Sequence, residues 1–197
     1  MPHDTPGRRR RDPARRIAEI VSATERVIAA RGIEGLTHRA VAAEAGVPLG
    51  ATTYHFATKD DLIQAALRRS VDRYAAYLDD WAGQRPDLTT EQLVVLLTDA
   101  LMGCFGPQRG QQVLEFELYV AALRRPALRP LADRYAQATA EVLSRFTDPL
   151  TANATAAAAT GLTLHGLAGT RPPTRTEIED ILRRVLTPHP VTARAGS

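Results

Sequence analysis

The sequence lacks the residues on which secreted mini-proteins and zinc domains depend. Of its 197 residues, one is a cysteine, Cys104, and one is a lysine, Lys59; aromatic residues make up 5%. A single cysteine excludes a disulfide framework and any zinc site built from several thiolates. With 44% hydrophobic and 24% charged residues, the composition is typical of a globular protein that buries its own core.

Long hydrophobic runs are also missing. Arg8 to Arg11 resemble the basic start of a secretion signal, but charged residues interrupt the stretch that follows, so no signal peptide is expected. The longest uncharged stretch, Pro149 to Thr170, is mainly Ala, Thr and Gly, which favours a packed helix over a membrane span. We therefore expect a cytoplasmic protein, with no membrane partner.

Recognisable catalytic motifs are absent too. There is no HExxH, no phosphate-binding loop, no paired acid motif and no Ser/His/Asp set at a known spacing, and the five histidines are scattered. We expect neither enzyme activity nor a cofactor or metal ion.

Positive charge is concentrated at the beginning of the chain. The first 60 residues include ten basic and seven acidic ones, and the rest of the chain has fifteen of each. One interpretation is an N-terminal region that binds a polyanion. The other is the codon bias of a GC-rich genome, which also explains 24 arginines against one lysine. Charge alone leaves both open.

Apolar residues recur at helical spacing, and no stretch alternates as a strand does. The pattern predicts an all-α protein of about nine helices, broken at glycines and prolines. Thr37 and Thr58 are placed to cap the second and fourth helices. The expected helices span about 13–31, 38–45, 48–55, 59–83, 90–105, 108–124, 127–147, 151–169 and 175–187.

The stretch from Thr37 to Tyr54 has the form of a helix-turn-helix. Gly46 supplies the left-handed conformation of a sharp turn, and Val41 and Val47 are placed to pack between the two helices. In this motif the second helix enters the major groove of DNA, with its first residues near the base edges.

The sequence around this motif contains further characteristic residues: Gly32, Leu36-Thr37, Val41-Ala42, Ala45-Gly46-Val47, Tyr54-His55-Phe56 and Lys59-Asp60-Asp61-Leu62. Through them, the stretch from about Arg15 to Ala66 resembles the TetR family of bacterial transcriptional regulators. The resemblance implies a homodimer that binds a palindromic operator in double-stranded DNA and leaves it when a small molecule occupies a second, helical domain.

The expected organisation has four parts. Residues 1–11 form a flexible Arg-rich arm, residues 12–58 the helix-turn-helix domain, residues 59–187 the effector-binding and dimerisation domain, and residues 188–197 a disordered tail. The division between the two domains lies near residue 58 or within the long fourth helix. The arm is either solvated or enters the minor groove.

The resemblance also implies which residues contact DNA. Thr37 and Lys59 touch phosphates, and Arg39 reads a base, often guanine. Thr37 is at the same time an N-cap. The other expected contacts lie on the second helix of the motif: Leu49, Gly50, Ala51, Thr53, Tyr54 and His55. The first three offer almost no hydrogen bonds, so their readout is by apolar contact or close backbone approach, and Tyr54 packs either on a base or on the scaffold.

Two positions depart from the family pattern. Thr53 stands where a tyrosine is usual, which removes a stacking face, and Pro48 stands where a Ser or Thr usually caps the helix. Proline suits a first helical turn but supplies neither the side-chain cap nor a backbone donor.

The second domain is expected to hold the effector pocket. On helix 108–124, Glu117 lies among apolar residues of the helical wheel, whereas Glu115 has glutamines beside it and is expected to face water. A carboxylate on an apolar face needs a partner, either an arginine such as Arg129 or Arg134, or a ligand.

His165 lies among small residues that allow close helix packing and suit a dimer interface. It is either a buried histidine or a ligand contact. The candidate pocket residues are Tyr74, Tyr77, Leu78, Leu97, Met102, Cys104, Phe105, Phe116, Glu117, Tyr119 and His165. Their mostly apolar character predicts a small apolar or amphipathic effector.

The sequence thus predicts a ligand-responsive transcriptional regulator, most often a repressor in this family. A nonspecific or architectural DNA-binding protein is the first alternative, and a discrete helix-turn-helix on a neutral helical domain argues against it. An all-α enzyme is the second, and the missing catalytic motifs argue against it.

Overall fold

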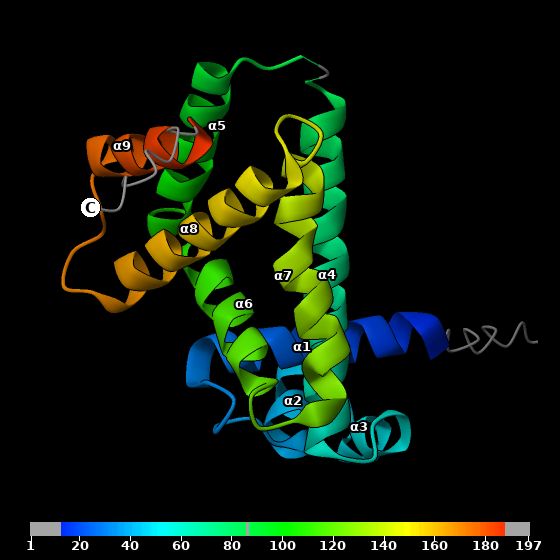
Figure 1. Cartoon of the computed structure of the whole chain (residues 1–197). Helices are drawn as coiled ribbons and strands as arrows, with labels where there is room; N and C mark the ends of the chain where they lie inside the picture. Colours follow the sequence, from blue (N-terminus) through cyan, green and yellow to red (C-terminus); the bar gives the residue numbers. More distant parts are fainter. Residues whose placement is uncertain (1–12, 86, 188–197) are drawn as a thin grey trace, which may run out of the picture. The chain divides into compact units, whose positions relative to one another are not determined.

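The computed structural model describes residues 13–85 and 87–187, which form helices and no strand (Figure 1). The predicted all-α class is confirmed. The expected arm and tail lie outside the described residues. The helices are α1 (Pro13–Arg31), α2 (His38–Ala45), α3 (Leu49–His55), α4 (Lys59–Gly83), α5 (Thr90–Phe105), α6 (Arg109–Ala121), the short 3₁₀ helix η1 (Pro126–Leu128), α7 (Arg129–Leu143), α8 (Pro149–Ala168) and α9 (Arg175–Leu186).

The chain forms two compact units that divide inside α4, between Ala66 and Leu67. The first unit is α1 to α3 with the beginning of α4, and the second is the remainder of α4 with α5 to α9. Because α4 runs without a break from Lys59 to Gly83, one helix carries residues of both units.

The core of the first unit comes from the apolar stripes of its helices. Ile20 and Ile28 of α1, Val41 of α2, and Leu62 and Ile63 of α4 are completely buried. Val47 is buried in the turn of the motif, as the sequence predicted, and Phe56 is buried at the end of α3. An ion pair of 2.5 Å between Arg26 and Glu44 ties α1 to α2 on the surface.

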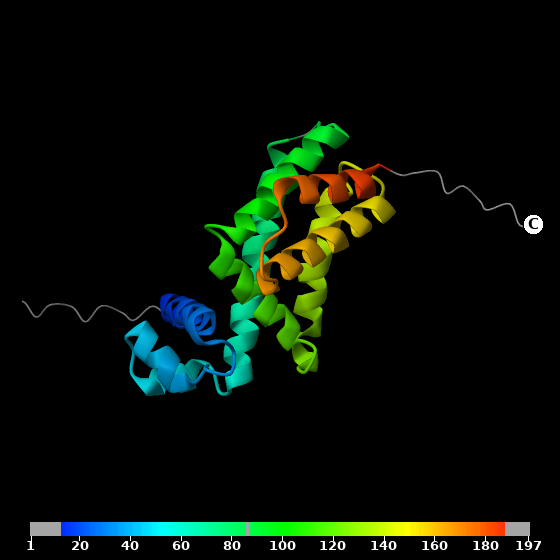
Figure 2. The same ribbon diagram turned by 90° about the vertical axis from the view of Figure 1, so that its left-hand side faces the viewer.

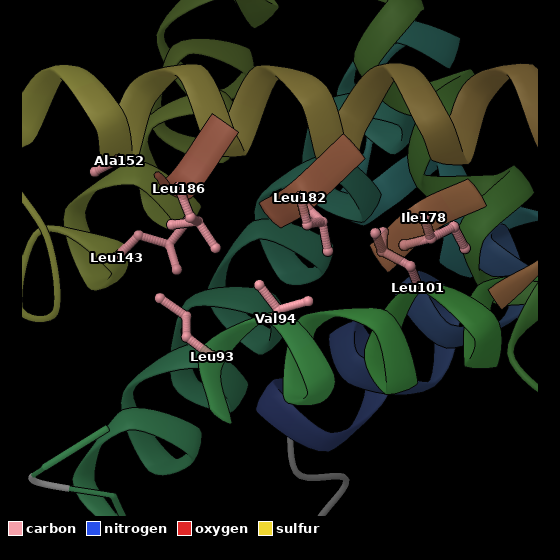
Figure 3. Packing of buried hydrophobic residues seen from close by; sticks show 8 residues of the cluster. All are labelled: Leu93, Val94, Leu101, Leu143, Ala152, Ile178, Leu182 and Leu186. Carbon is pink, nitrogen blue, oxygen red and sulfur yellow. The ribbon is translucent and has the colours of Figure 1, made fainter. Parts of the chain in front are cut away.

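The second unit packs α9 against α5 and α8, with α8 also on α7 (Figures 1 and 2). Figure 3 shows the main core cluster, in which side chains of α9 point toward α5 and the end of α7. The cluster consists of Leu93, Val94, Leu101, Leu143, Ala152, Ile178, Leu182 and Leu186. Ion pairs join α4 to α7 (Asp72–Arg134), α4 to the turn after α7 (Asp79–Arg145) and α5 to α9 (Asp99–Arg175 and Glu91–Arg183).

Gly166 of α8 packs closely against other segments of the same chain. A Cβ added there would lie 2.7 Å from Cζ of Phe105 and 2.7 Å from Cδ of Pro173. At Gly161, one and a half turns earlier, an added Cβ would meet nothing within 4 Å. The two glycines therefore have different roles, which their spacing in the sequence does not reveal.

We expect Gly166→Ala to lower the free energy of unfolding by about 1–3 kcal/mol, because the added methyl group must displace a packed ring. Gly161→Ala is the matched control and should raise it by up to about 1 kcal/mol, since alanine is the better helix former. Urea denaturation of both variants measures the difference. Equal stabilities would contradict the packing described at Gly166.

No helix among the described residues has the length and hydrophobicity needed to cross a bilayer.

Candidate functional site

The turn of the helix-turn-helix is built as its residues predict. Thr37 is the N-cap of α2, and its Oγ1 accepts a hydrogen bond of 3.0 Å from the backbone N–H of Ala40. Gly46 ends α2 in the left-handed conformation, with φ of 65°, which glycine adopts without strain. The backbone N–H of Val47 then donates to the carbonyl of Ala42 and closes the turn at 3.0 Å.

The second helix of the motif, α3, presents apolar and aromatic groups to solvent. Tyr54 is 84% exposed and Leu49 is 44% exposed, whereas Thr52 between them is fully buried and donates to the carbonyl of Leu49. The rings of Tyr54 and His55 meet edge to face at 5.0 Å. Pro48 is the N-cap and makes no side-chain hydrogen bond, as its departure from the family pattern predicts.

The first turn of α4 is held by a capping box. Asp61 accepts a hydrogen bond from the backbone N–H of Thr58, and the Thr58 hydroxyl accepts one from that of Asp61. These bonds to Thr58 lower the pKa of the Asp61 carboxyl. The box fixes the direction in which α4 leaves the motif, with Lys59 as its first residue.

The predicted DNA-contacting residues are grouped on the first unit. All of them are exposed or half-buried, and they occupy α2 and its cap, α3, or the first position of α4: Thr37, Arg39, Leu49, Gly50, Ala51, Thr53, Tyr54, His55 and Lys59. Thr53 bonds weakly back to its own helix, at 3.4 Å to the Gly50 carbonyl. Their contact with DNA stays a prediction.

A cavity of about 790 Å³ lies in the second unit, among α4, α5, α6, α7 and α8. Its walls are aromatic and aliphatic, with a few polar groups. The aromatic residues are Tyr74, Tyr77 and Trp81 of α4, Phe116 and Tyr119 of α6, and Tyr135 of α7. Tyr135 lies with its ring 4.9 Å from that of Tyr74 and 5.8 Å from that of Tyr119.

A buried carboxylate belongs to this cavity. Glu115 is 8% exposed and accepts hydrogen bonds from Gln111 (2.8 Å), Gln112 (3.1 Å) and the Tyr135 hydroxyl (3.1 Å). The guanidinium of Arg73, on α4, lies 4.0 Å from the same carboxylate. Glu115 and Arg73 are the two charged side chains among the described residues that line the cavity.

Three ionisable side chains of the cavity have pKa values above their ordinary ones. Burial raises the pKa of Tyr74 to about 12 and that of the Cys104 thiol to about 11, with a further contribution from the charge of Glu115. Burial raises the pKa of Tyr135, and the charge of Glu115 raises it further. The cavity therefore offers a cation one carboxylate and several neutral rings.

The structure brings seven of the eleven predicted pocket residues together. Tyr74, Tyr77, Leu78, Leu97, Cys104, Phe116 and Tyr119 line the cavity. Met102 and Phe105 do not line it, because they pack against the core cluster shared by α5 and α9. His165 is exposed and also lies off the lining, since the buried face of α8, which includes Thr155 and Thr163, does not extend to it.

The assignment of the two glutamates was wrong. Glu115, expected to face water, is buried in the cavity, and Glu117 is half-buried and not part of the lining. The buried residues of α6 are Leu114, Glu115, Phe116, Leu118 and Ala121, so the buried face is wider than the apolar stripe of the helical wheel and extends over Glu115. Arg134, one partner expected for Glu117, pairs with Asp72 instead.

Tyr135 and Trp81 were not predicted as pocket residues. Tyr135 lies on the stripe Leu131, Ala138 and Val142 of α7, a spacing that marks it as inward-facing. Trp81 is partly buried, and its ring meets that of Phe146 edge to face. Among the described residues, no group of three or more His, Cys, Asp or Glu is arranged to hold a metal ion.

The two units together define a DNA-binding regulator with a ligand-binding domain. The sequence model for bacterial regulatory proteins of the tetR family matches residues 20–66, and that for the tetracyclin repressor-like C-terminal domain matches residues 88–188. The chain belongs to the TetR family of transcriptional regulators, as the helix-turn-helix residues predicted.

Solved structures of similar proteins cover almost the whole chain. The multidrug binding protein EbrR is 42% identical; its ethidium complex covers 87% of this chain and 99% of its own, with a TM-score of 0.77. EbrR has also been solved with imidazole, proflavin and malachite green. SCO1917 of Streptomyces coelicolor A3, a TetR family member, is 41% identical over 87% of this chain and 98% of its own, with a TM-score of 0.73.

Another relative matches over a shorter stretch of the sequence. The HTH-type transcriptional regulator PksA of Bacillus subtilis (strain 168) is 32% identical over 110 residues. The match covers 56% of this chain and spans about half the length of PksA.

Proposed function

We propose that this protein is a repressor that binds a palindromic operator as a homodimer and is released when a small molecule fills the cavity of the second unit. The observation that carries the proposal is α4, which begins at Lys59 in the DNA-binding unit and lines the cavity with Tyr74, Tyr77 and Trp81. A ligand that moves this helix acts on both units. Such a regulator works in the cytoplasm, on the nucleoid.

The exposed side chains of α2 and α3 support specific binding to DNA. The N-terminal end of α2, with Thr37 as its cap, is suited to a phosphate. Arg39 is an exposed guanidinium two residues later, with the reach for a guanine edge. On α3, the exposed Leu49 and Tyr54 supply apolar and aromatic contacts.

The cavity favours an aromatic cation as effector. Its rings offer stacking and cation–π contacts, and Glu115 is the one anionic side chain among the described lining residues. Three of the molecules found with EbrR (ethidium, proflavin and malachite green) are aromatic cations. The sequence predicts an apolar or amphipathic effector, and the cavity narrows that class to aromatic cations.

The exposed faces of α8 and α9 support the dimer. Leu150 and Leu164 of α8 are 81% and 42% exposed, and Ile181 of α9 is 41% exposed. A partner chain that covers these faces removes their apolar groups from water.

The proposal is tested with an operator selected in vitro from a pool of random duplexes. We expect the selected sequences to be palindromic, with half-sites one helical turn apart, and to bind at least about 1,000-fold more tightly than random DNA at physiological salt. An architectural protein would bind both DNAs alike, with the same salt dependence.

Two substitutions should weaken DNA binding in different ways. Lys59→Ala should weaken operator and random DNA alike and reduce the salt slope by about one for each Lys59 lost, because a phosphate contact is removed. Arg39→Ala should cost about 1–3 kcal/mol on the operator and relax one base position in each half-site. Titrations at several salt concentrations separate the two. An equal loss on all sequences for Arg39→Ala would contradict its role in base reading.

A further inference from the structure

The cavity contains its own cation. Arg73 of α4 lies on the lining with its Nη2 4.0 Å from Oε1 of Glu115. The two side chains differ in exposure: that of Arg73 is 41% exposed and that of Glu115 is 9% exposed. The carboxylate is therefore inside, and the guanidinium lies at the rim, in contact with water.

The carboxylate of Glu115 is held in place by three neutral donors. Gln111 and Gln112 donate from the same helix, and Tyr135 donates from α7, all at 2.8–3.1 Å. At 4.0 Å, the Arg73–Glu115 pair is longer than a hydrogen bond. Moving the guanidinium away from Glu115 thus breaks no hydrogen bond to the carboxylate, and the exposed part of the Arg73 side chain is accessible to water.

We propose that Arg73 is the internal counterion of the effector site, which a cationic effector displaces from Glu115 when it binds. The inference rests on the proposed function, in that it takes an aromatic cation as the ligand of this cavity. Two cations near one carboxylate repel each other, so the ligand must move the arginine outward to reach full contact. A neutral aromatic molecule can occupy the rings without this exchange.

The exchange also gives the ligand a means of acting on α4. Arg73 lies seven residues beyond Ala66, on the helix that starts at Lys59. While the guanidinium faces Glu115, it attracts α4 toward α6, and displacement removes this attraction. A cation therefore acts on α4 directly, and a neutral ligand of the same shape acts on it less.

The test compares ethidium with the uncharged 6-phenylphenanthridine on the full-length protein, in the absence of DNA, by quenching of Trp81 fluorescence. We expect Arg73→Gln to bind ethidium about three- to tenfold more tightly than the wild type, because the competing charge is gone. Binding of the neutral compound should not change. Arg73→Lys keeps the charge and should behave like the wild type.

Arg134→Gln is the matched control, because it removes a guanidinium that pairs with Asp72 of α4 at 2.6 Å and is not on the cavity lining. Its ethidium affinity should not change. If the wild type binds ethidium and Arg73→Gln binds it with equal or lower affinity, the counterion role of Arg73 is wrong. The proposed effector class is unaffected by that result. A wild type that binds neither compound would instead overturn the effector class, and the counterion role with it.

Discussion

Leu164→Glu should turn the dimer into monomers and reduce operator affinity by about 100-fold or more. Leu164 is a large apolar side chain on the outer face of α8, in a helix otherwise rich in Ala, Thr and Gly. A carboxylate buried there in both copies would lose its hydration and meet its symmetry mate.

The size of the effect follows from two-site binding. When two linked helix-turn-helix units bind one operator, the second contact is intramolecular, and the resulting gain in affinity is commonly 10²- to 10⁴-fold. A monomer loses that gain. Sedimentation gives the oligomeric state, and fluorescence anisotropy with a labelled operator gives the affinity.

Leu123→Glu provides the matched control for this substitution. Leu123 is 76% exposed and lies in the turn after α6, so it belongs to neither α8 nor α9. This variant should stay dimeric with unchanged operator affinity. If the Leu164→Glu protein is dimeric and binds the operator with normal affinity, the dimer interface does not include Leu164.

Glu115→Gln should weaken ethidium binding by about 10- to 100-fold. The substitution keeps the shape of the side chain and removes the negative charge, so a cation in the cavity loses its one anionic partner. Affinity for the uncharged 6-phenylphenanthridine should stay within about twofold of the wild type. Fluorescence titration of Trp81, which lines the same cavity, measures both affinities.

Glu117→Gln on the same helix is the control for this experiment. It makes the same change of charge two residues away, at a side chain that does not line the cavity. Its ethidium affinity should equal that of the wild type. If instead Glu117→Gln weakened binding and Glu115→Gln did not, the cavity would not be the site at which the cation binds.

Most of the fold could be predicted because its signals are local. Thr37 caps α2, Gly46 ends it with a positive φ, and Thr58 with Asp61 starts α4, each through contacts within a few residues. Such contacts depend on residue type and spacing, both of which a sequence contains. The same is true of the helix-turn-helix, which is one local pattern.

The cavity could be predicted only in part, because its lining depends on which helices become neighbours. Glu115 and Glu117 both had apolar residues within one turn, and the choice between them required the positions of α4 and α7. Tyr135 supplies the α7 donor that satisfies Glu115, 20 residues away. Gly166 likewise shows its role only through Phe105 and Pro173, which lie on other segments.

We propose that ligand and operator act on one another through α4, and this coupling is tested by the reciprocity of the two affinities. The affinity of an aromatic cation that does not intercalate, tetraphenylphosphonium, is measured with and without saturating selected operator. We expect the operator to weaken cation binding about 5- to 150-fold, and the cation to weaken operator binding by the same factor. A cation that binds equally tightly in both titrations, while the operator is still released, would contradict coupling of the two sites through α4.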